Sequence, residues 1–232
     1  MSGLFIAGTN TGVGKTYVAA LIARALVAAG RRVGVYKPVA SGCRRKGDSL
    51  VAEDAKLLWQ AAGEPGEFQR VCPQQFAKPV APPRAAQAEG RQVDRELLRT
   101  GLDYWREQCE IVLVEGAGGL MSPLSEVDYN IDLARDLGLP LVIVAANELG
   151  TINATLQTLI TAGAKAPRLP IAGIVLSQTR SEADESVATN AAELAARCGV
   201  PVLASVPFLA QDLPAEVDWF SLAASLRLAG DA

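Results

Sequence analysis

The feature that most constrains the fold is a glycine-rich segment, GTNTGVGKT at residues 8–16. An apolar run at 4–7 precedes it as an expected strand, and a helical pattern at 15–29 follows it. A strand, a glycine turn and a helix start in this order surround an anion with backbone N–H groups. The spacing is G-x5-G-K-T, one residue longer than the usual G-x4-G-K-[ST]. Glycines that serve only a tight turn are the alternative, but Lys15 has little reason to stand beside a positive helix end without an anion. The segment therefore predicts a phosphate-binding loop.

Short apolar runs alternate with longer helical patterns along the whole chain. The runs are continuous rather than alternating in polarity, which is typical of a parallel sheet covered on both faces. The expected strands are 4–7, 33–36, 111–114, 141–145, 171–176 and 202–206. The expected helices are 15–29, 50–62, 94–108, 131–137, 153–163, 182–197 and 219–228. This pattern predicts an α/β fold of the P-loop NTPase type, in which residues 1–232 form a single domain around an open, mostly parallel sheet.

One stretch departs from the alternation. Residues 63–92 carry five of the 13 prolines and are expected to form an irregular excursion. A substrate-side lid and a plain surface excursion both fit this composition.

The composition excludes several functions. The net charge of −3 gives no excess of positive charge for binding nucleic acid. The sequence has no histidine, which excludes a Ser-His-Asp triad, a Cys-His dyad and any His-ligated metal. The four cysteines are scattered without a CxxC pair, as expected in a reducing cytosol. No apolar run approaches the roughly 18 residues of a membrane span, and no basic stretch precedes the first apolar run as in a signal peptide. We expect a cytoplasmic protein without a membrane partner.

Two charged residues stand at the ends of apolar strands, where parallel sheets form their ligand crevice. Lys37 follows one strand and precedes a proline, and its ammonium suits a phosphoryl or carboxylate oxygen. Glu115 follows the strand 111–114 and precedes the glycines 116–119, as an acid that positions magnesium or its waters does. The alternatives are a solvated strand-end lysine and an exposed carboxylate before a turn.

Asp54 lies within the expected helix 50–62. The apolar face of that helix consists of Leu50, Val51, Leu57, Leu58 and Ala61. Asp54 falls in the middle of this face, and a buried carboxylate needs a cation or strong donors. Magnesium is one such cation. The alternative is a capping or salt-bridged acid in a helix that starts later.

The segment ELGTIN, residues 148–153, leads from a strand into a helix. Thr151 or Asn153 is expected to cap this helix. The alternative is that its free N–H groups receive a substrate carboxylate.

These segments together resemble the dethiobiotin synthetase family. The resemblance rests on GTNTGVGKT (8–16), YKPVASG (36–42), VEGAGG (114–119) with PLS (123–125), LGTIN (149–153) and VPFLA (206–210). They occur in family order and cover nearly the whole chain.

The resemblance implies an ATP-dependent ligase that joins CO2 to 7,8-diaminopelargonate in biotin biosynthesis. One amine takes up CO2 as a carbamate, which attacks the γ-phosphorus to give a carbamic–phosphoric anhydride. The second amine then closes the ring, releasing dethiobiotin and phosphate. The implied cofactor is Mg2+, and the implied assembly is a homodimer with the substrate site at the subunit interface.

The resemblance also implies roles for individual residues. The implied catalytic residues are Lys37, Lys15, Thr11 and Ser41. The implied nucleotide-binding residues are Gly12, Val13, Gly14, Lys15, Thr16, Tyr17, Glu115, Ser177, Gln178, Pro207, Phe208 and Leu209. The implied substrate-binding residues are Thr11, Lys37, Ser41, Gly118, Gly150, Thr151, Ile152 and Asn153. The implied Mg2+ ligands are Thr16, Asp54 and Glu115. Replacing Lys37 by alanine is expected to remove turnover and leave the fold intact.

The sequence departs from the family pattern in three places. Asn10 replaces the usual Asp, and Ala-Pro-Pro at 81–83 replaces Ser-Pro-His. Ser177 and Gln178 replace the Asn-Asp pair that reads the base. Because a serine is less selective than an asparagine amide, we expect looser base discrimination, with CTP or GTP accepted in place of ATP.

Two other classes share local features with this chain. Partition-type regulatory ATPases have a further lysine in K-G-G-x-x-G-K, where this chain has Thr9, Asn10 and Thr11. Amide-forming ligases of the cobyrinate type add a glutaminase domain, for which 232 residues leave no room.

Overall fold

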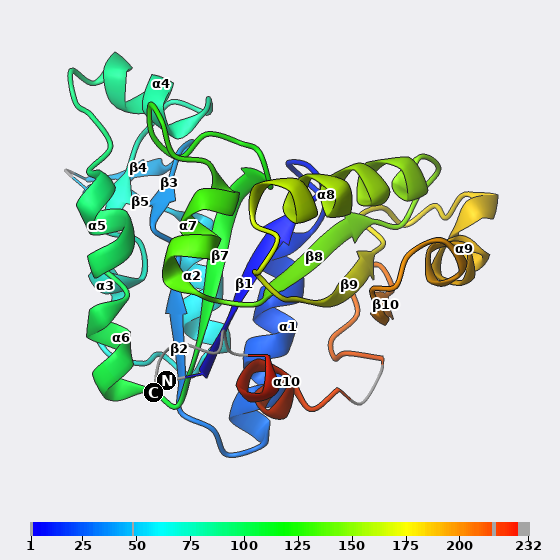
Figure 1. Cartoon of the computed structure of the whole chain (residues 1–232). Helices are drawn as coiled ribbons and strands as arrows, with labels where there is room; N and C mark the ends of the chain where they lie inside the picture. Colours follow the sequence, from blue (N-terminus) through cyan, green and yellow to red (C-terminus); the bar gives the residue numbers. More distant parts are fainter. Residues whose placement is uncertain (1, 48, 215–216, 227–232) are drawn as a thin grey trace.

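The computed structural model describes residues 2–47, 49–214 and 217–226. Its centre is a six-stranded sheet in the order β10-β9-β8-β1-β7-β2, and every pairing in it is parallel (Figure 1). The strands are β1 (Ser2–Gly8), β2 (Val33–Tyr36), β7 (Ile111–Gly119), β8 (Leu141–Ala146), β9 (Ile171–Ser177) and β10 (Val202–Val206). The predicted open α/β sheet is confirmed.

Helices cover both faces of this sheet. Figure 1 shows α7 (Asn130–Leu137) and α8 (Thr151–Lys165) on one face, and α1 (Lys15–Ala28) and α2 (Glu53–Ala61) on the other. All seven residues of β1 are buried between these layers. Strands with two covered faces need apolar side chains throughout, which explains the continuous apolar runs.

Most predicted elements agree with the structure to within two residues at each end. The strand predicted at 111–114 is longer, because β7 continues through the glycines to Gly119. The last helix, predicted at 219–228, is α10 (Trp219–Ser225), and residues 227–228 lie outside the described part.

Three predicted helices are wrong in part. The helix predicted at 50–62 starts only at Glu53, because β5 (Ser49–Val51) pairs with β4 (Arg44–Lys46) as a hairpin. The helix predicted at 182–197 is a 3-10 turn, Glu185–Ala188, followed by α9 (Asn190–Arg197).

The helix predicted at 94–108 is divided into α5 (Arg95–Thr100) and α6 (Asp103–Gln108). The break lies at Gly101, where the Tyr36 hydroxyl packs so closely that a Cβ has no room. This hydroxyl also donates to the Leu97 carbonyl at 2.7 Å, so it takes an acceptor at the end of α5. A contact between distant residues therefore divides the helix.

The segment 63–92 is more ordered than predicted. It contains α3 (Phe68–Val71), β6 (Gln74–Gln75), which pairs with β3 (Val39–Ala40), and α4 (Pro82–Ala88). Two of the prolines open α4, where a missing N–H breaks no helical hydrogen bond. Val71, Phe76 and Ala85 are fully buried, so the segment is packed into the core. In the described part of the chain, no helix is long and apolar enough to cross a membrane.

Candidate active site

The residues predicted for a site gather at the carboxyl edge of the sheet, the upper edge in Figure 1. The glycine loop follows β1, Lys37 follows β2, and Glu115 stands within β7 beside Ile6 of β1. Segments of interest also follow β8, β9 and β10. Parallel sheets place their ligand crevice at this edge.

The loop after β1 has the geometry of an anion cradle. Gly12 and Gly14 have φ values of 76° and 89°, a region that favours glycine. Gly8 is also required, because a Cβ there would lie 2.7 Å from the Asn10 carbonyl oxygen. The chain folds back on itself at this point.

Lys15 folds over the same loop. Its ammonium donates to the Asn10 carbonyl at 3.2 Å, and the side chain is 7% exposed. Burial lowers the pKa of Lys15, and the nearby Glu115 carboxylate opposes this effect. A buried ammonium that bonds a neutral carbonyl, and no carboxylate among the described residues, is suited to receive an anion.

Lys37 stands between two carboxylates. Its Nζ lies 2.6 Å from Glu115 Oε1 and 3.0 Å from Asp54 Oδ2, and the residue is 4% exposed. Burial acts to lower the pKa of Lys37, but Glu115 and Asp54 outweigh it and raise the pKa above its usual value. Thr16 Oγ1 donates to the same Glu115 Oε1 at 2.8 Å. The structure therefore brings Thr16, Lys37, Asp54 and Glu115 into one cluster.

Asp54 belongs to this cluster, but not for the predicted reason. Because α2 starts only at Glu53, Asp54 lies in its first turn and its side chain is 57% exposed. Leu57, placed on the same buried face by the sequence pattern, is 40% exposed. Burial raises the pKa of Asp54, but the Lys37 charge outweighs it and the pKa is lowered. The alternative of a salt-bridged acid in a later-starting helix is correct.

The oxygen atoms around Glu115 fit a hard divalent cation. Glu115 is 2% exposed, and its Oε2 has no hydrogen-bond partner among the described residues. A buried carboxylate oxygen without a donor favours a cation nearby. Two carboxylates and the Thr16 hydroxyl are a donor set that Mg2+ accepts while keeping several waters. No group of three or more His, Cys, Asp or Glu able to hold a metal occurs in ranges 2–47, 49–214 and 217–226.

The predicted substrate residues divide into two groups. Thr11 and Gly118 lie together, since a Cβ on Gly118 would be 3.4 Å from Thr11 Oγ1. Ser41 is half-buried directly after β3. The segment 150–153 follows β8, on the other side of β1 from β7 and β2.

The sheet order separates the second group from Lys37. Strands β1 and β7 lie between β8 and β2, and three strand spacings amount to roughly 14 Å. Helix α8 starts at Thr151, and no side-chain cap bond forms there within the described part. The predicted capping by Thr151 or Asn153 is wrong. Thr151 Oγ1 is instead buried without a described partner.

The predicted nucleotide residues beyond the loop lie on neighbouring strands. Ser177 ends β9 and packs against the glycine loop, because a Cβ on Gly14 would be 2.5 Å from its Oγ. Gln178 donates to the Arg180 carbonyl at 3.0 Å within its own turn. Phe208 and Leu209 follow β10 and are 38% and 63% exposed. The Tyr17 hydroxyl donates to the Ala210 carbonyl, which ties the segment 207–209 to α1.

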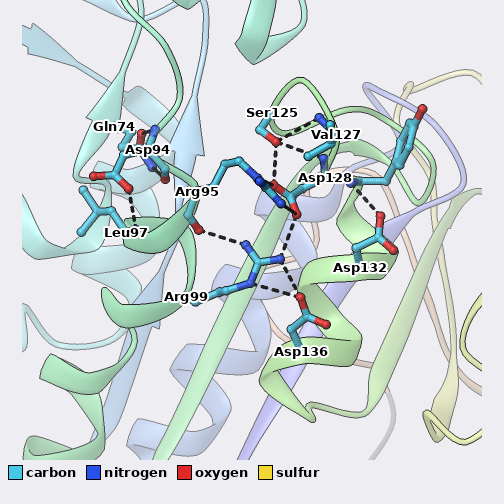
Figure 2. Close-up of polar contacts among 11 residues, drawn as sticks. Gln74, Asp94, Arg95, Leu97, Arg99, Ser125, Val127, Asp128, Asp132 and Asp136 are labelled. Atoms are coloured by element: carbon cyan, nitrogen blue, oxygen red, sulfur yellow. Dashed lines mark hydrogen bonds and ion pairs between the residues drawn. The ribbon is translucent and has the colours of Figure 1, made fainter.

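A polar cluster centred on Asp128, shown in Figure 2, was not predicted from the sequence. The Asp128 side chain is 5% exposed and accepts hydrogen bonds from Arg95 Nε at 2.7 Å, Arg99 Nη2 at 2.8 Å and Ser125 Oγ at 2.6 Å. Arg99 Nη2 also donates to Asp136 Oδ2 of α7 at 2.6 Å. Asp128 thus joins α5 to the loop after β7, and Arg99 extends the cluster to α7. The only sequence signal was the motif PLS, which contains Ser125.

This cluster predicts a loss of stability in acid. Burial acts to raise the pKa of Asp128, but hydrogen bonds from Arg95, Ser125 and Arg99 outweigh it and hold the pKa well below its usual value. The unfolded chain therefore takes up a proton first, near the ordinary pKa of about 3.9. The contribution is complete above that pH and is lost as the pH falls toward the folded pKa.

Asp128→Asn is expected to lower the free energy of unfolding by roughly 1.5–3 kcal/mol at neutral pH, and by less in acid. Urea unfolding of both proteins at about pH 7 and about pH 3 measures this difference. The exposed neighbour Glu126, changed to Gln, is the control and should leave stability nearly unchanged. An Asp128→Asn deficit of equal size at both pH values would contradict the assignment.

The fold and the site together define a P-loop α/β protein with charged groups gathered at the carboxyl edge of its sheet. The profile of the AAA domain family matches residues 2–214. The chain is 44% identical over 209 residues to an ATP-dependent dethiobiotin synthetase BioD from Anaeromyxobacter dehalogenans, covering 90% of this chain and 91% of that protein. It belongs to the dethiobiotin synthetase family.

Two further relatives carry the same name. The protein from Rhodopirellula baltica is 42% identical, with 87% of this chain and 82% of that protein covered. The protein from Bacillus cereus strain B4264 is 40% identical, with 93% and 87% covered. Among solved structures, the signal recognition particle receptor FtsY from Elizabethkingia anophelis is similar in fold, with a TM-score of 0.51 and 15% identity. That match covers 97% of this chain and 65% of the FtsY chain, and it shows the fold alone.

Proposed function

We propose that this chain converts 7,8-diaminopelargonate, CO2 and ATP into dethiobiotin, ADP and phosphate. The family membership supports the reaction. The observation that carries the mechanism is the buried ammonium of Lys37 on the same sheet edge as the phosphate-type loop and Lys15. Phosphoryl transfer depends mainly on positioning and on neutralising charge, and this edge offers both.

The proposed reaction has three steps. A neutral amine forms a C–N bond to CO2 and loses a proton, leaving a carbamate. A carbamate oxygen attacks the γ-phosphorus and the bond to the β-phosphate oxygen breaks, so ADP leaves. The second amine attacks the carbonyl carbon, the bond to the phosphate oxygen breaks, and ring closure releases phosphate and a proton.

The loop holds the nucleotide phosphates in this proposal. Backbone N–H groups of Gly12, Val13, Gly14, Lys15 and Thr16 surround the β-phosphate, as the left-handed glycines allow. The Lys15 ammonium exchanges the Asn10 carbonyl for β- and γ-phosphate oxygens. Tyr17, Ser177, Gln178 and 207–209 line the side where the base lies.

Lys37 acts as a fixed cation rather than as a base. Its pKa is raised, so it stays charged throughout the physiological range. It stabilises the carbamate and the charge that develops on the transferring phosphoryl group. Thr11 and Ser41 bind the reacting end of the substrate, beside the Gly118 backbone.

Thr16, Asp54 and Glu115 would hold Mg2+, which would neutralise charge between the β- and γ-phosphates when bound. The unpartnered Glu115 Oε2 supports this choice of residues. The position of Thr16 on the first turn of α1, beside Lys15, suits a ligand to the same metal.

We place the substrate carboxylate at 150–153 of a second subunit in a homodimer. The start of α8 suits a carboxylate, because the first N–H groups of a helix find no acceptor within it, although that of Thr151 donates to the Glu148 carbonyl at 3.1 Å. Leu149 and Ile160, 82% and 71% exposed, give this region apolar surface for a partner. Sedimentation velocity measures the assembly, and a monomer at assay concentration would rule out the dimer.

The proposed function is tested by phosphate release from ATP with magnesium and bicarbonate, with and without the diamine. Release that requires the diamine, together with a cyclic urea product by mass spectrometry, is the expected result. Slow release that ignores the diamine would indicate the regulatory ATPase class instead.

The net charge and the expected cytoplasmic location agree with small-molecule substrates and no nucleic-acid partner.

Base preference gives a second expectation. Ser177 is 2% exposed and packed on Gly14, and the Gln178 amide is engaged in its own turn. Strong rejection of a wrong base, 10⁴-fold or more, needs buried groups built to bond the right one, so we expect kcat/KM for CTP and GTP within about tenfold of that for ATP. Steady-state assays with the four nucleotides measure this ratio. A preference for ATP above about a hundredfold would refute it.

A further inference from the structure

The glycine segment 116–119, which follows Glu115, is held by one buried side chain from α7. Asn130 is 1% exposed, and its Nδ2 donates to the carbonyls of Ala117 and Gly119, each at 2.8 Å. The same Nδ2 lies 3.2 Å from the Ser122 carbonyl oxygen. Its Oδ1 accepts from the Ala117 N–H at 3.1 Å. The Asn130 amide thus bonds both a backbone N–H and backbone carbonyls of the segment.

The glycines make room for this contact. A Cβ on Gly116 would overlap Asn130 Oδ1, and a Cβ on Gly118 would overlap Ser122 Oγ. Ser122 Oγ also accepts from the Gly119 N–H at 2.9 Å. Gly118 has a φ of 76°, which favours glycine. The segment is therefore shaped around two side chains and is not a loose turn.

The held segment touches the phosphate-type loop directly. The Leu120 N–H donates to the Gly8 carbonyl at 2.9 Å, and a Cβ on Gly119 would lie 3.1 Å from the Thr9 carbonyl oxygen. Gly118 faces Thr11 across the site. A shift of this segment would therefore move the backbone that lies beside the reacting end of the substrate.

The Asp128 cluster anchors the other side of Asn130. Asp128 lies two residues before Asn130 and binds Arg95 and Arg99, and Arg99 also binds Asp136 of α7 (Figure 2). The start of α7 is thus tied to α5 as well as to the glycine segment. Asn130 is fixed from both directions, as a residue that sets a geometry must be.

We propose that Asn130, assisted by Ser122, is a positioning residue that sets the 116–119 backbone for the diamine substrate. The inference rests on the proposed function, since it needs the reacting amines beside Gly118. The expected effect differs between the diamine and the nucleotide. The contacts of the segment fall on Gly8, Thr9 and Thr11, whereas the nucleotide phosphates are held by the N–H groups of residues 12–16, so the diamine site should be affected more than the phosphate site.

The test uses Asn130→Asp, which keeps the shape of the side chain and places a carboxylate oxygen against three carbonyl oxygens. We expect KM for the diamine to rise at least tenfold while KM for ATP stays within twofold. Ser122→Ala, at a half-buried position, removes only the bond from Gly119 and should raise KM for the diamine about threefold.

The matched control is Gln74→Glu, an equally isosteric change in another buried amide. Gln74 is 4% exposed, donates to the Asp94 carbonyl at 3.0 Å and accepts from the Asp94 N–H at 2.8 Å. It should lower the melting temperature as Asn130→Asp does, without changing either KM. Amide hydrogen exchange of a peptide covering 116–120 gives a second readout and should quicken at least tenfold in Asn130→Asp but not in Gln74→Glu.

A parallel rise of both KM values, or an unchanged KM for the diamine, would overturn the inference. If Asn130→Asp does not fold, Ser122→Ala decides by the same criterion. The wild-type assay distinguishes failure of the positioning role from failure of the proposed function. Dethiobiotin made by wild type with no effect in the variants refutes only the positioning role, whereas no dethiobiotin from wild type refutes the proposed function and the positioning role with it.

Discussion

Lys37→Met is expected to lower kcat by about a thousandfold, since removing one preorganised donor from a developing charge costs 10²–10³ in kcat and Lys37 carries a full charge. The methionine keeps the length of the side chain and removes the ammonium that, in the proposed mechanism, faces the carbamate and the phosphoryl group. Single-turnover phosphate release measures the step itself. A kcat within tenfold of wild type would remove Lys37 from the proposed mechanism.

The same variant is expected to lose stability, which revises the sequence-based expectation of an intact fold. Lys37 is 4% exposed and lies 2.6 Å from Glu115, so its removal leaves a buried carboxylate without its cation. Breaking a buried pair in this way costs about 3–5 kcal/mol. The double variant Lys37→Met, Glu115→Gln removes that unpaired charge. It should regain much of the stability and none of the activity, which separates the two effects in urea unfolding and turnover assays.

Lys15→Met is expected to have a large effect on activity and a small one on the fold. Among the described residues the Lys15 ammonium bonds to the Asn10 carbonyl alone, and burial lowers its pKa, so the folded chain gains little from its charge. With nucleotide, it would face the β- and γ-phosphates. We expect kcat/KM for ATP to fall by roughly 10³ while the melting temperature stays the same or rises.

Calorimetric binding of ADP and a melting curve test this contrast. Lys56→Met, at an exposed position on α2, is the control and should change neither quantity. A Lys15→Met protein that binds nucleotide as tightly as wild type would contradict the role of the loop.

The sheet and the loop could be predicted because their signals are local. Continuous apolar runs such as β8 are required wherever both faces of a strand are covered, and the strand, glycine turn and lysine of the loop are adjacent in sequence. The charged residues at strand ends followed from the same rule, because parallel strands present their carboxyl ends together.

The errors came from contacts between distant residues. The hairpin of β4 and β5 shortens α2 and moves Asp54 off the buried face. The Tyr36 hydroxyl, from β2, packs at the end of α5 and bonds Leu97, 61 residues later in the chain. Asn130 and Asp128 were missed because nothing in their neighbours indicates that one meets a glycine segment and the other an arginine pair. Side-chain bonds of this kind depend on the assembled fold.

The charges of the Lys37 cluster have a consequence for the order in which ligands arrive. The two ammonium groups of Lys15 and Lys37 balance the two carboxylates of Asp54 and Glu115, so the site has no net charge of its own. A bare ATP tetra-anion entering it gains from the lysines but meets the carboxylates as well. The magnesium complex carries half that charge and a cation that suits those carboxylates. Nucleotide and metal should therefore enter as one complex, and ATP in excess over magnesium should act as a poor substrate rather than as a potent inhibitor.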